Sequence, residues 1–313
     1  MDLSIVIPTY NRFESCRKLA SSIDQQKWHK NVKFKIYDNA STDKRYEKLF
    51  EKISSKWEII RRHSNIGYPA SYNQIIYEIE TKWLIVIGDD DSIKEDFAEK
   101  LQKLVSNIND KVIAIKTSCN LNKKFKQEFR DEEIHNLNEL FTKISNPSIF
   151  SEFIFISTWV VNAQIFKFFL EDSNKTQSSM CTHLNPIFYG LRTGEYQILY
   201  RNVSIVNHNT PTQQAWSCTE IYPLLISTFI FSNLMKEDLL IRKLITGITG
   251  KSIYKILGFY IRILNEKDKF IARRLIKLLN VFGSKKHKLI GMVILIFPDN
   301  FFLWKYLIRL REK

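Results

Sequence analysis

Over its first 120 residues the chain alternates strictly between short segments rich in β-branched residues and segments with helical periodicity. Strands are expected at 3–7, 32–38, 57–62, 83–87 and 111–116, and helices at 12–26, 46–54, 69–80 and 94–106. Such alternation favours an α/β fold with a mostly parallel central sheet flanked by helices, because each helix returns the chain for another strand in the same direction. The region after residue 215 is expected to be helical.

Polar motifs follow three of the expected strands. They read PTYNR (8–12), DNASTD (38–43) and GDDD (88–91). Ligands of doubly wound sheets bind beyond the carboxyl ends of the strands. The three motifs are therefore expected to be neighbours in space, at one binding site.

The run Asp89–Asp91 directly follows an apolar segment expected to be a buried strand. Neighbouring carboxylates about 4 Å apart repel one another by roughly 4 kcal/mol at the effective dielectric of a protein surface. A divalent cation would convert this repulsion into ligation. The plainer alternative is a solvated turn that caps the next helix. That alternative explains one acid but not three at the end of a buried strand.

The composition is that of an ordinary folded protein, with 44% hydrophobic and 26% charged residues among 313. Its four cysteines are scattered, without a CxxC pair, which fits neither a zinc site nor a disulfide framework. The N-terminus lacks the features of a signal peptide, and the longest apolar run, LIGMVILIF, is far shorter than the roughly 20 residues of a membrane span. We therefore expect a cytoplasmic protein.

The net charge of +14 is concentrated near the C-terminus. Residues 236–313 contain 18 Lys and Arg against 6 Asp and Glu, whereas the rest of the chain contains 29 against 27. The segments 270–282 and 299–313 have apolar stripes with basic residues on other faces. Solvated outer faces would explain this pattern. Because each cation contributes about 1 kcal/mol near an anionic leaflet, we expect peripheral attachment to the inner face of the cell membrane.

The segments SIVIPTYNR, YDNASTD, NIGYPASYNQI and VIGDDDSI, in this order and spacing, resemble the inverting glycosyltransferases of family 2, which have the GT-A fold. The resemblance is strong over residues 3–115 and loose over 116–215. It implies a catalytic domain at 1–215, with a nucleotide-sugar half at 1–115 and an acceptor half at 116–215. The basic helical region at 216–313 would follow it.

The resemblance also implies a nucleotide site at the motifs. Tyr10 would stack on the nucleotide, Asp38 would accept a hydrogen bond from the base, and Gly67 would allow close approach of the diphosphate. A strand-to-helix turn and an Asx turn are the structural alternatives. The full set of expected nucleotide-binding residues is Pro8, Thr9, Tyr10, Asn11, Asp38, Asn39, Asn65, Gly67, Asp89 and Asp90.

Relatives usually carry D-x-D-D after the fourth strand, and two alignments are open. With Asp96 as the anchor, Asp90 and Asp91 match the closing pair and Gly88 replaces the first acid. Alternatively, Asp89 and Asp91 themselves form D-x-D. Either alignment predicts Mg²⁺ or Mn²⁺ held by this run, with the diphosphate completing the shell. His208 is a further candidate ligand.

The catalytic base departs from the family pattern. Inversion requires a group that deprotonates the acceptor hydroxyl. Relatives place an acid pair where this chain has Thr182 and His183, so His183 is the candidate base; a packing role is the alternative. The acid pair Glu171–Asp172 lies upstream of the expected position. Trp159 is expected to stack on the acceptor sugar or to belong to the core.

Together these features predict transfer of a sugar, most readily from a UDP-sugar, to a hydroxyl of a growing glycan or lipid-linked saccharide. The expected setting is capsule, polysaccharide or lipopolysaccharide assembly. Two rival functions are a nucleotide-sugar-binding relative without catalysis and a basic nucleic-acid-binding protein. The second is disfavoured, and no nucleic-acid partner is expected, because the aromatic residues of the basic C-terminal region occupy apolar helix positions. A nucleotidyltransferase is disfavoured because PTYNR contains no glycine.

Overall fold

The computed structural model describes residues 2–118, 130–144, 153, 155–173, 182–207, 276 and 285–296. The chain divides into two compact units. The first comprises residues 1–137, 151–177 and 182–215, and the second comprises residues 138–150, 178–181 and 216–313. The first unit contains the central sheet and the candidate site.

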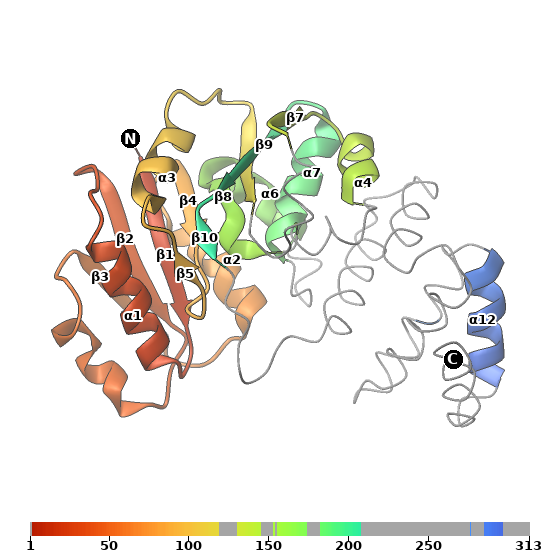
Figure 1. Cartoon of the computed structure of the whole chain (residues 1–313). Helices are drawn as coiled ribbons and strands as arrows, with labels where there is room; N and C mark the ends of the chain where they lie inside the picture. Colours follow the sequence, from red (N-terminus) through yellow and green to blue (C-terminus); the bar gives the residue numbers. More distant parts are fainter. Residues whose placement is uncertain are drawn as a thin grey trace, which may run out of the picture. The chain divides into compact units, whose positions relative to one another are not determined.

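The central sheet of the first unit has eight strands in the order β3-β2-β1-β4-β8-β6-β9-β7 (Figure 1). All neighbours pair in parallel except those of β8 and β7, which run antiparallel to the rest. The strands are β1 (Leu3–Thr9), β2 (Val32–Asp38), β3 (Trp57–Arg61), β4 (Trp83–Val86), β6 (Val112–Ser118), β7 (Glu132–Ile134), β8 (Trp159–Asn162) and β9 (Gln197–Ser204). A separate two-stranded ribbon pairs β5 (Ser92–Ile93) with β10 (Val206–Asn207).

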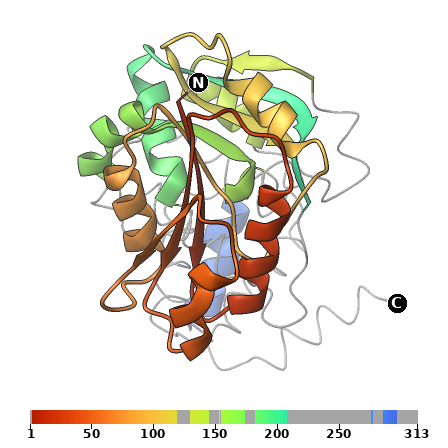
Figure 2. The same cartoon turned by 90° about the vertical axis from the view of Figure 1, so that its left-hand side faces the viewer.

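Helices cover both faces of the sheet. Figure 2 shows α1 and α3 on one side of β1 and β2, with α2, α6 and α7 on the other. The α-helices are α1 (Phe13–Asp24), α2 (Tyr68–Glu78), α3 (Phe97–Val105), α4 (Leu137–Ile144), α6 (Ala163–Ser173), α7 (Asn185–Thr193) and α12 (Lys285–Ile296). The 3₁₀ turns are η1 (Lys44–Glu51), η3 (Ile156–Thr158) and η5 (Thr182–Leu184).

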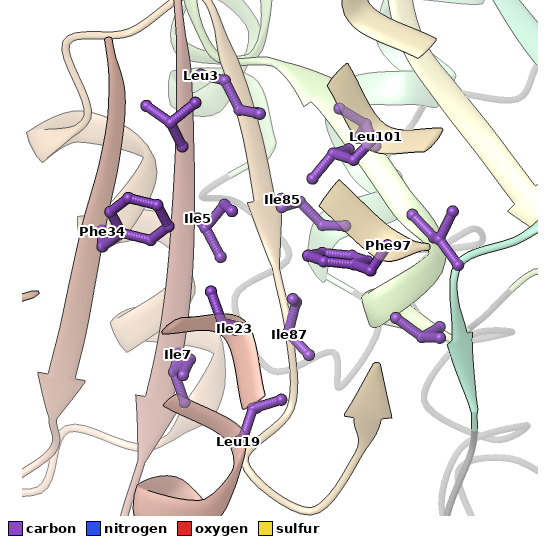
Figure 3. Close-up of a cluster of buried hydrophobic side chains, with 14 of the residues drawn as sticks. Leu3, Ile5, Ile7, Leu19, Ile23, Phe34, Ile85, Ile87, Phe97 and Leu101 are labelled. Atoms are coloured by element: carbon purple, nitrogen blue, oxygen red, sulfur yellow. The ribbon is translucent and has the colours of Figure 1, made fainter. Parts of the chain in front are cut away.

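The main hydrophobic core lies between the sheet and the α1–α3 layer (Figure 3). Alternate residues of β1 point to this side, and α1 contributes apolar residues at helical spacing. These side chains from β1 and α1 pack, together with those of β4, against the apolar face of α3. The fully buried members of these elements include Leu3, Ile5, Ile7, Cys16, Ala20, Ile23, Ile85, Phe97 and Leu101.

The predicted fold class is confirmed: the sheet is mostly parallel and flanked by helices. Two local expectations need correction. The segment expected as an α-helix at 46–54 is the 3₁₀ element η1, which has a kink at Lys48. The helix expected from residue 94 begins at Phe97, because the chain before it pairs with β10 and the Lys94 N–H still donates to the Ile205 carbonyl.

The polar segment 121–150 contains regular structure within its described residues, 130–144. Its β7 pairs with β9 at the edge of the sheet, and α4 follows. In the C-terminal region, α12 is helical as expected, whereas the predicted amphipathic helices at 270–282 and 299–313 lie outside the described residues apart from Ile276. No helix in the described part of the chain is long and apolar enough to cross a membrane.

Ile85 tests the core, because it is fully buried on β4 between the two covering layers. We expect Ile85→Ala to lower the free energy of unfolding by about 3 kcal/mol, through lost burial and a residual cavity. Urea unfolding followed by circular dichroism measures this loss. Phe168→Ala is the control, since Phe168 is 74% exposed and its truncation should change stability by less than about 0.5 kcal/mol. Equal effects would contradict this account of the core.

Candidate functional site

The three polar motifs meet at the carboxyl ends of β1, β2 and β4. β1 pairs with β2 on one side and with β4 on the other. The strand order therefore reverses between β1 and β4, and a crevice for ligands forms at such a point in an open α/β sheet. The loops that meet there carry residues 10–12, 39–43 and 87–91. This confirms that the motifs lie together, as their positions after the strands predict.

The turn after β1 is fastened to the loop after β2 through Asn11. This residue has a positive φ of 55°, which asparagine tolerates better than most residues. Its Oδ1 accepts the backbone N–H groups of Thr42 and Asp43 at 2.8 and 3.3 Å, and its own N–H donates to Ser41 Oγ at 2.8 Å. The adjacent Tyr10 is left 41% exposed at this edge. Asn11 therefore has a structural role in joining the two motifs.

A chain of hydroxyl groups fixes the first acid of the run. Thr9 Oγ1 donates to Asp89 Oδ2 at 2.7 Å and lies 2.5 Å from the Tyr46 hydroxyl, which in turn accepts the Arg12 N–H at 3.0 Å. Since the Thr9 proton is directed at the carboxylate, the phenol donates to Thr9. Burial raises the pKa of Tyr46 to about 12, so the phenol keeps the proton it donates. The Thr9 hydroxyl thus holds Asp89 in place.

The three carboxylates of the acid run have different surroundings. Arg12 Nη1 contacts Asp89 Oδ1 at 3.0 Å and Asp90 Oδ2 at 2.8 Å. Asp91 Oδ2 instead accepts a hydrogen bond at 2.6 Å from the hydroxyl of Ser157, which lies in η3. The side chains of Asp89 and Asp90 are 7% and 28% exposed. Burial raises the pKa of Asp89 to about 6, although Thr9 and Arg12 act in the opposite direction.

Gly88 sits where a side chain would collide with the acid run. A Cβ at this position would lie 3.0 Å from both Asp90 Oδ1 and Asp91 Oδ2. Its backbone N–H donates to Ser157 Oγ at 2.9 Å, so Ser157 links the start of the run to Asp91. A side chain at position 88 would therefore crowd two carboxylates of the acid run.

The donor set of the acid run fits Mg²⁺ or Mn²⁺ that arrives with an anionic ligand. Carboxylate oxygens are the hard ligands these ions prefer, and Asp89 and Asp90 already converge on one positive group, Arg12. Among the described residues, however, no three His, Cys, Asp or Glu side chains form a group that could hold a metal ion. The arrangement therefore suits a cation that completes its shell with phosphate oxygens and water, and does not suit an all-protein cage.

Asp38 lies at the end of β2 and is 1% exposed. Its Oδ1 accepts the Ser41 N–H at 2.8 Å, and its Oδ2 lies 3.3 Å from Arg61 Nε. Arg61 also donates to the Ser41 carbonyl at 2.7 Å. The carboxylate is thus oriented from two sides, which suits a group that recognises a ligand in one fixed direction.

The loop before α2 is joined to the same edge. Asn39 Nδ2 donates to Asn65 Oδ1 at 2.8 Å, and that oxygen also accepts the Gly67 N–H at 2.9 Å. Gly67 has a φ of 76°, a conformation that favours glycine, and α2 begins at the next residue. The N-terminus of α2 therefore opens beside the predicted nucleotide residues.

The predicted acceptor residues lie in less accessible surroundings. His183 is 1% exposed in η5, where its ring meets Tyr72 of α2 edge-on, and the neighbouring Thr182 donates to Asn73 at 3.2 Å. Trp159 is 2% exposed, stacks edge-on with Phe153 and donates its indole N–H to the Phe153 carbonyl. Of the two roles left open for Trp159, this burial favours the core role over sugar stacking. His208 lies outside the described residues.

Three residues of the site escaped the sequence-based prediction: Arg12, Tyr46 and Ser157. Arg12 is part of the motif PTYNR, but its pairing with the acid run depends on side-chain geometry. Tyr46 lies in a segment expected only to be helical, and Ser157 lies beside Trp159 in the segment assigned to the acceptor. A search for hydroxyl and cationic side chains after neighbouring strands would have included Arg12.

The sequence profile described as "Glycosyl transferase family 2" matches residues 4–166, about half of the chain. Among curated proteins, the dolichol-phosphate mannosyltransferase of Pyrococcus furiosus is 30% identical over 112 residues, covering 35% of this chain and 32% of that protein. The abequosyltransferase RfbV of Salmonella typhimurium is 30% identical over 128 residues, covering 39% and 38%. The chain thus matches about a third of the length of these relatives.

Solved structures resemble the fold more extensively. TarS residues 1–349 of S. aureus, in complex with UDP-GlcNAc, gives a TM-score of 0.60 at 16% identity, covering 90% of this chain and 80% of that one. The mannosyltransferase PcManGT from Pyrobaculum calidifontis, in complex with GDP-Man and Mn²⁺, gives 0.53 at 13% identity, covering 97% and 82%. At these identities the likeness concerns the fold alone.

The fold and the profile define the class of this protein: it has the GT-A fold. The chain belongs to glycosyltransferase family 2. The resemblance seen in the four sequence motifs is therefore confirmed for family and fold.

Thr9 tests the hydroxyl chain that fixes Asp89. We expect Thr9→Val to lower the free energy of unfolding by about 1–3 kcal/mol, because a buried carboxylate oxygen loses its donor. Thermal and urea unfolding measure the loss. Thr9→Ser keeps the hydroxyl and removes only a methyl group, so it should stay within about 1 kcal/mol of the wild type. Equal losses in the two variants would mean that the methyl group, not the hydrogen bond, matters.

Proposed function

We propose that this protein is a glycosyltransferase that binds a nucleoside-diphosphate sugar and transfers the sugar to an acceptor hydroxyl. The observation that carries the proposal is the acid run Asp89–Asp91 at the point where the strand order reverses, beside the ends of β1 and β2. Family membership and the nucleotide-sugar complexes of the structural neighbours support it. A UDP-sugar is the favoured donor.

The residues around this edge have chemistry suited to each part of a nucleotide. Asp38, buried and oriented by Ser41 and Arg61, would accept a hydrogen bond from an N–H group of the base. The exposed ring of Tyr10 would supply a stacking surface. The backbone around Gly67, at the start of α2, would receive the diphosphate, since helix N-termini favour anions.

The acid run would hold Mg²⁺ or Mn²⁺ together with the diphosphate. Asp90, the more exposed of the two carboxylates that contact Arg12, is the preferred direct ligand. Asp89 and Asp91, which accept from Thr9 and Ser157, would support it. The cation would offset the charge that develops on the leaving nucleoside diphosphate. The Mn²⁺ in the PcManGT complex supports the use of a divalent cation.

Transfer with inversion would require a base, and His183 is the proposed one. Its burial in this structure is compatible with that role only if the acceptor reaches it beside Tyr72. The proposed acceptor is a growing glycan or a lipid-linked saccharide, which the chain would meet at the inner face of the cell membrane. The cationic excess of residues 236–313 supports this location.

Metal-dependent binding of UDP tests the donor site. Calorimetry should detect UDP binding that is stronger with Mn²⁺ than without it. Asp90→Asn should weaken UDP binding in the presence of Mn²⁺ by tenfold or more, about 1.4 kcal/mol, because a proposed metal ligand loses its charge. We choose Asp90 because it is the more exposed of the two acids that contact Arg12.

Asp110→Asn is the matched control, since the Asp110 side chain is 91% exposed and pairs only with Lys82 in the described part of the chain. It should bind UDP as the wild type does. If UDP fails to bind, dTDP, GDP and CMP are tested next. Failure of all four with both metals would overturn the donor-site proposal.

A nucleotide-sugar-binding relative without catalysis is the rival function, because the family acid pair is replaced by Thr182 and His183. Release of UDP from UDP-sugars, followed by a coupled assay with and without saccharide acceptors, separates the two. We expect turnover, and we expect His183→Gln to lower kcat by about 10²–10⁴ with UDP affinity unchanged. A parallel loss of UDP affinity and stability would indicate that His183 only packs against Tyr72. Binding without turnover of any donor would favour the rival.

A further inference from the structure

Arg12 holds an unusual position, because one nitrogen of its guanidinium joins two acids of the proposed metal site. Nη1 contacts Asp89 Oδ1 at 3.0 Å and Asp90 Oδ2 at 2.8 Å. Nε and Nη2 have no hydrogen bond or ion pair with the described residues, which leaves three N–H donors for a ligand. The side chain is 38% exposed.

We propose that Arg12 is a resident cation that stabilises the acid run before metal binds and competes with the divalent ion for Asp90. This inference rests on the proposed metal site. Arg12 would then be a positioning residue that sets the metal affinity of the protein. A purely structural ion pair is the alternative.

The competition follows from geometry. The guanidinium nitrogen lies 2.8 Å from the Asp90 oxygen, whereas Mg²⁺ binds an oxygen at about 2.0–2.1 Å. Two cations cannot use the same oxygen lone pair along the same direction. Metal binding to Asp90 Oδ2 from the side that Arg12 occupies therefore requires the guanidinium to move away, although Asp89 can keep its contact with Thr9.

The side chain can move while the backbone stays. The Arg12 N–H donates to the Tyr46 hydroxyl at 3.0 Å, and Arg12 is the N-cap residue of α1. These contacts fix the main chain and leave the long side chain to reorient. A guanidinium released next to a diphosphate would pair with its oxygens, since charge-assisted bonds to phosphate are among the strong ones. Arg12 would thereby pass from the carboxylates to the donor.

Titration of the full-length protein with Mn²⁺ alone tests the competition. Bound Mn²⁺ is measured from the loss of the free-ion electron paramagnetic resonance signal, for the wild type and for Arg12→Gln. We expect Arg12→Gln to bind Mn²⁺ about five- to tenfold more tightly, and to bind UDP more weakly at saturating Mn²⁺. Arg17→Gln is the control, because Arg17 pairs with Glu14 on an exposed part of α1 and should change neither value.

Unchanged or weaker Mn²⁺ binding by Arg12→Gln would overturn the competition and assign Arg12 to a structural role. Absence of Mn²⁺ binding by both proteins would also overturn it. Either failure is distinguishable from failure of the donor site. If one of them occurs while the wild type binds UDP with Mn²⁺ and Asp90→Asn does not, the proposed function stands and only this inference falls.

A second measurement uses the wild type alone, in case Arg12→Gln does not fold. Phenylglyoxal modifies accessible guanidinium groups, and peptide mass spectrometry locates the modified arginine. Mn²⁺ should raise the modification of Arg12, and UDP added with Mn²⁺ should lower it again. Arg17 should be modified equally in every condition. A constant Arg12 signal would contradict release of the side chain.

Discussion

The register of β1 between β2 and β4 is the constraint on which the site depends. Thr9 lies opposite Asp38 in the ladder with β2. On the other side Val6 pairs with Val86, so the same register continued by three residues brings Asp89 level with Thr9, in agreement with their hydrogen bond. A slip of one residue would turn every side chain of β1 to the opposite face. It would separate Asp38 from the acid run.

The acid run is tolerated because its charges are distributed among different partners. Asp89 accepts from Thr9, Asp89 and Asp90 share Arg12, and Asp91 accepts from Ser157. Buried polar groups are costly unless they are hydrogen-bonded, and the raised pKa of Asp89 shows that burial still outweighs its partners. The packing at Gly88 completes this arrangement, since a side chain there would crowd two of the carboxylates.

Much of the fold and of the candidate site could be predicted from the sequence, and there is a physical reason why the rest could not. The strand-and-helix alternation predicts the parallel sheet, and the rule for carboxyl ends predicts that Thr9, Asp38 and Asp89 meet. Arg12 and Ser157 were missed because their roles depend on side-chain directions across elements, which periodicity does not encode. The burial of Trp159 was left open for the same reason: an aromatic residue after a loop suits both a core and a sugar site.

The three carboxylates of the acid run have different partners, and this difference bears on which ligand the site selects. Two of its three carboxylates accept hydrogen bonds from hydroxyl groups of the protein, and Asp90 contacts the guanidinium of Arg12. On the proposed function, a divalent ion would find few oxygens among the described residues and would need oxygens from its ligand to complete six-fold coordination. A diphosphate can offer oxygens from two adjacent phosphoryl groups, whereas a monophosphate offers them from one. The scarcity of protein ligands would therefore favour nucleoside diphosphates and couple cation binding to donor binding.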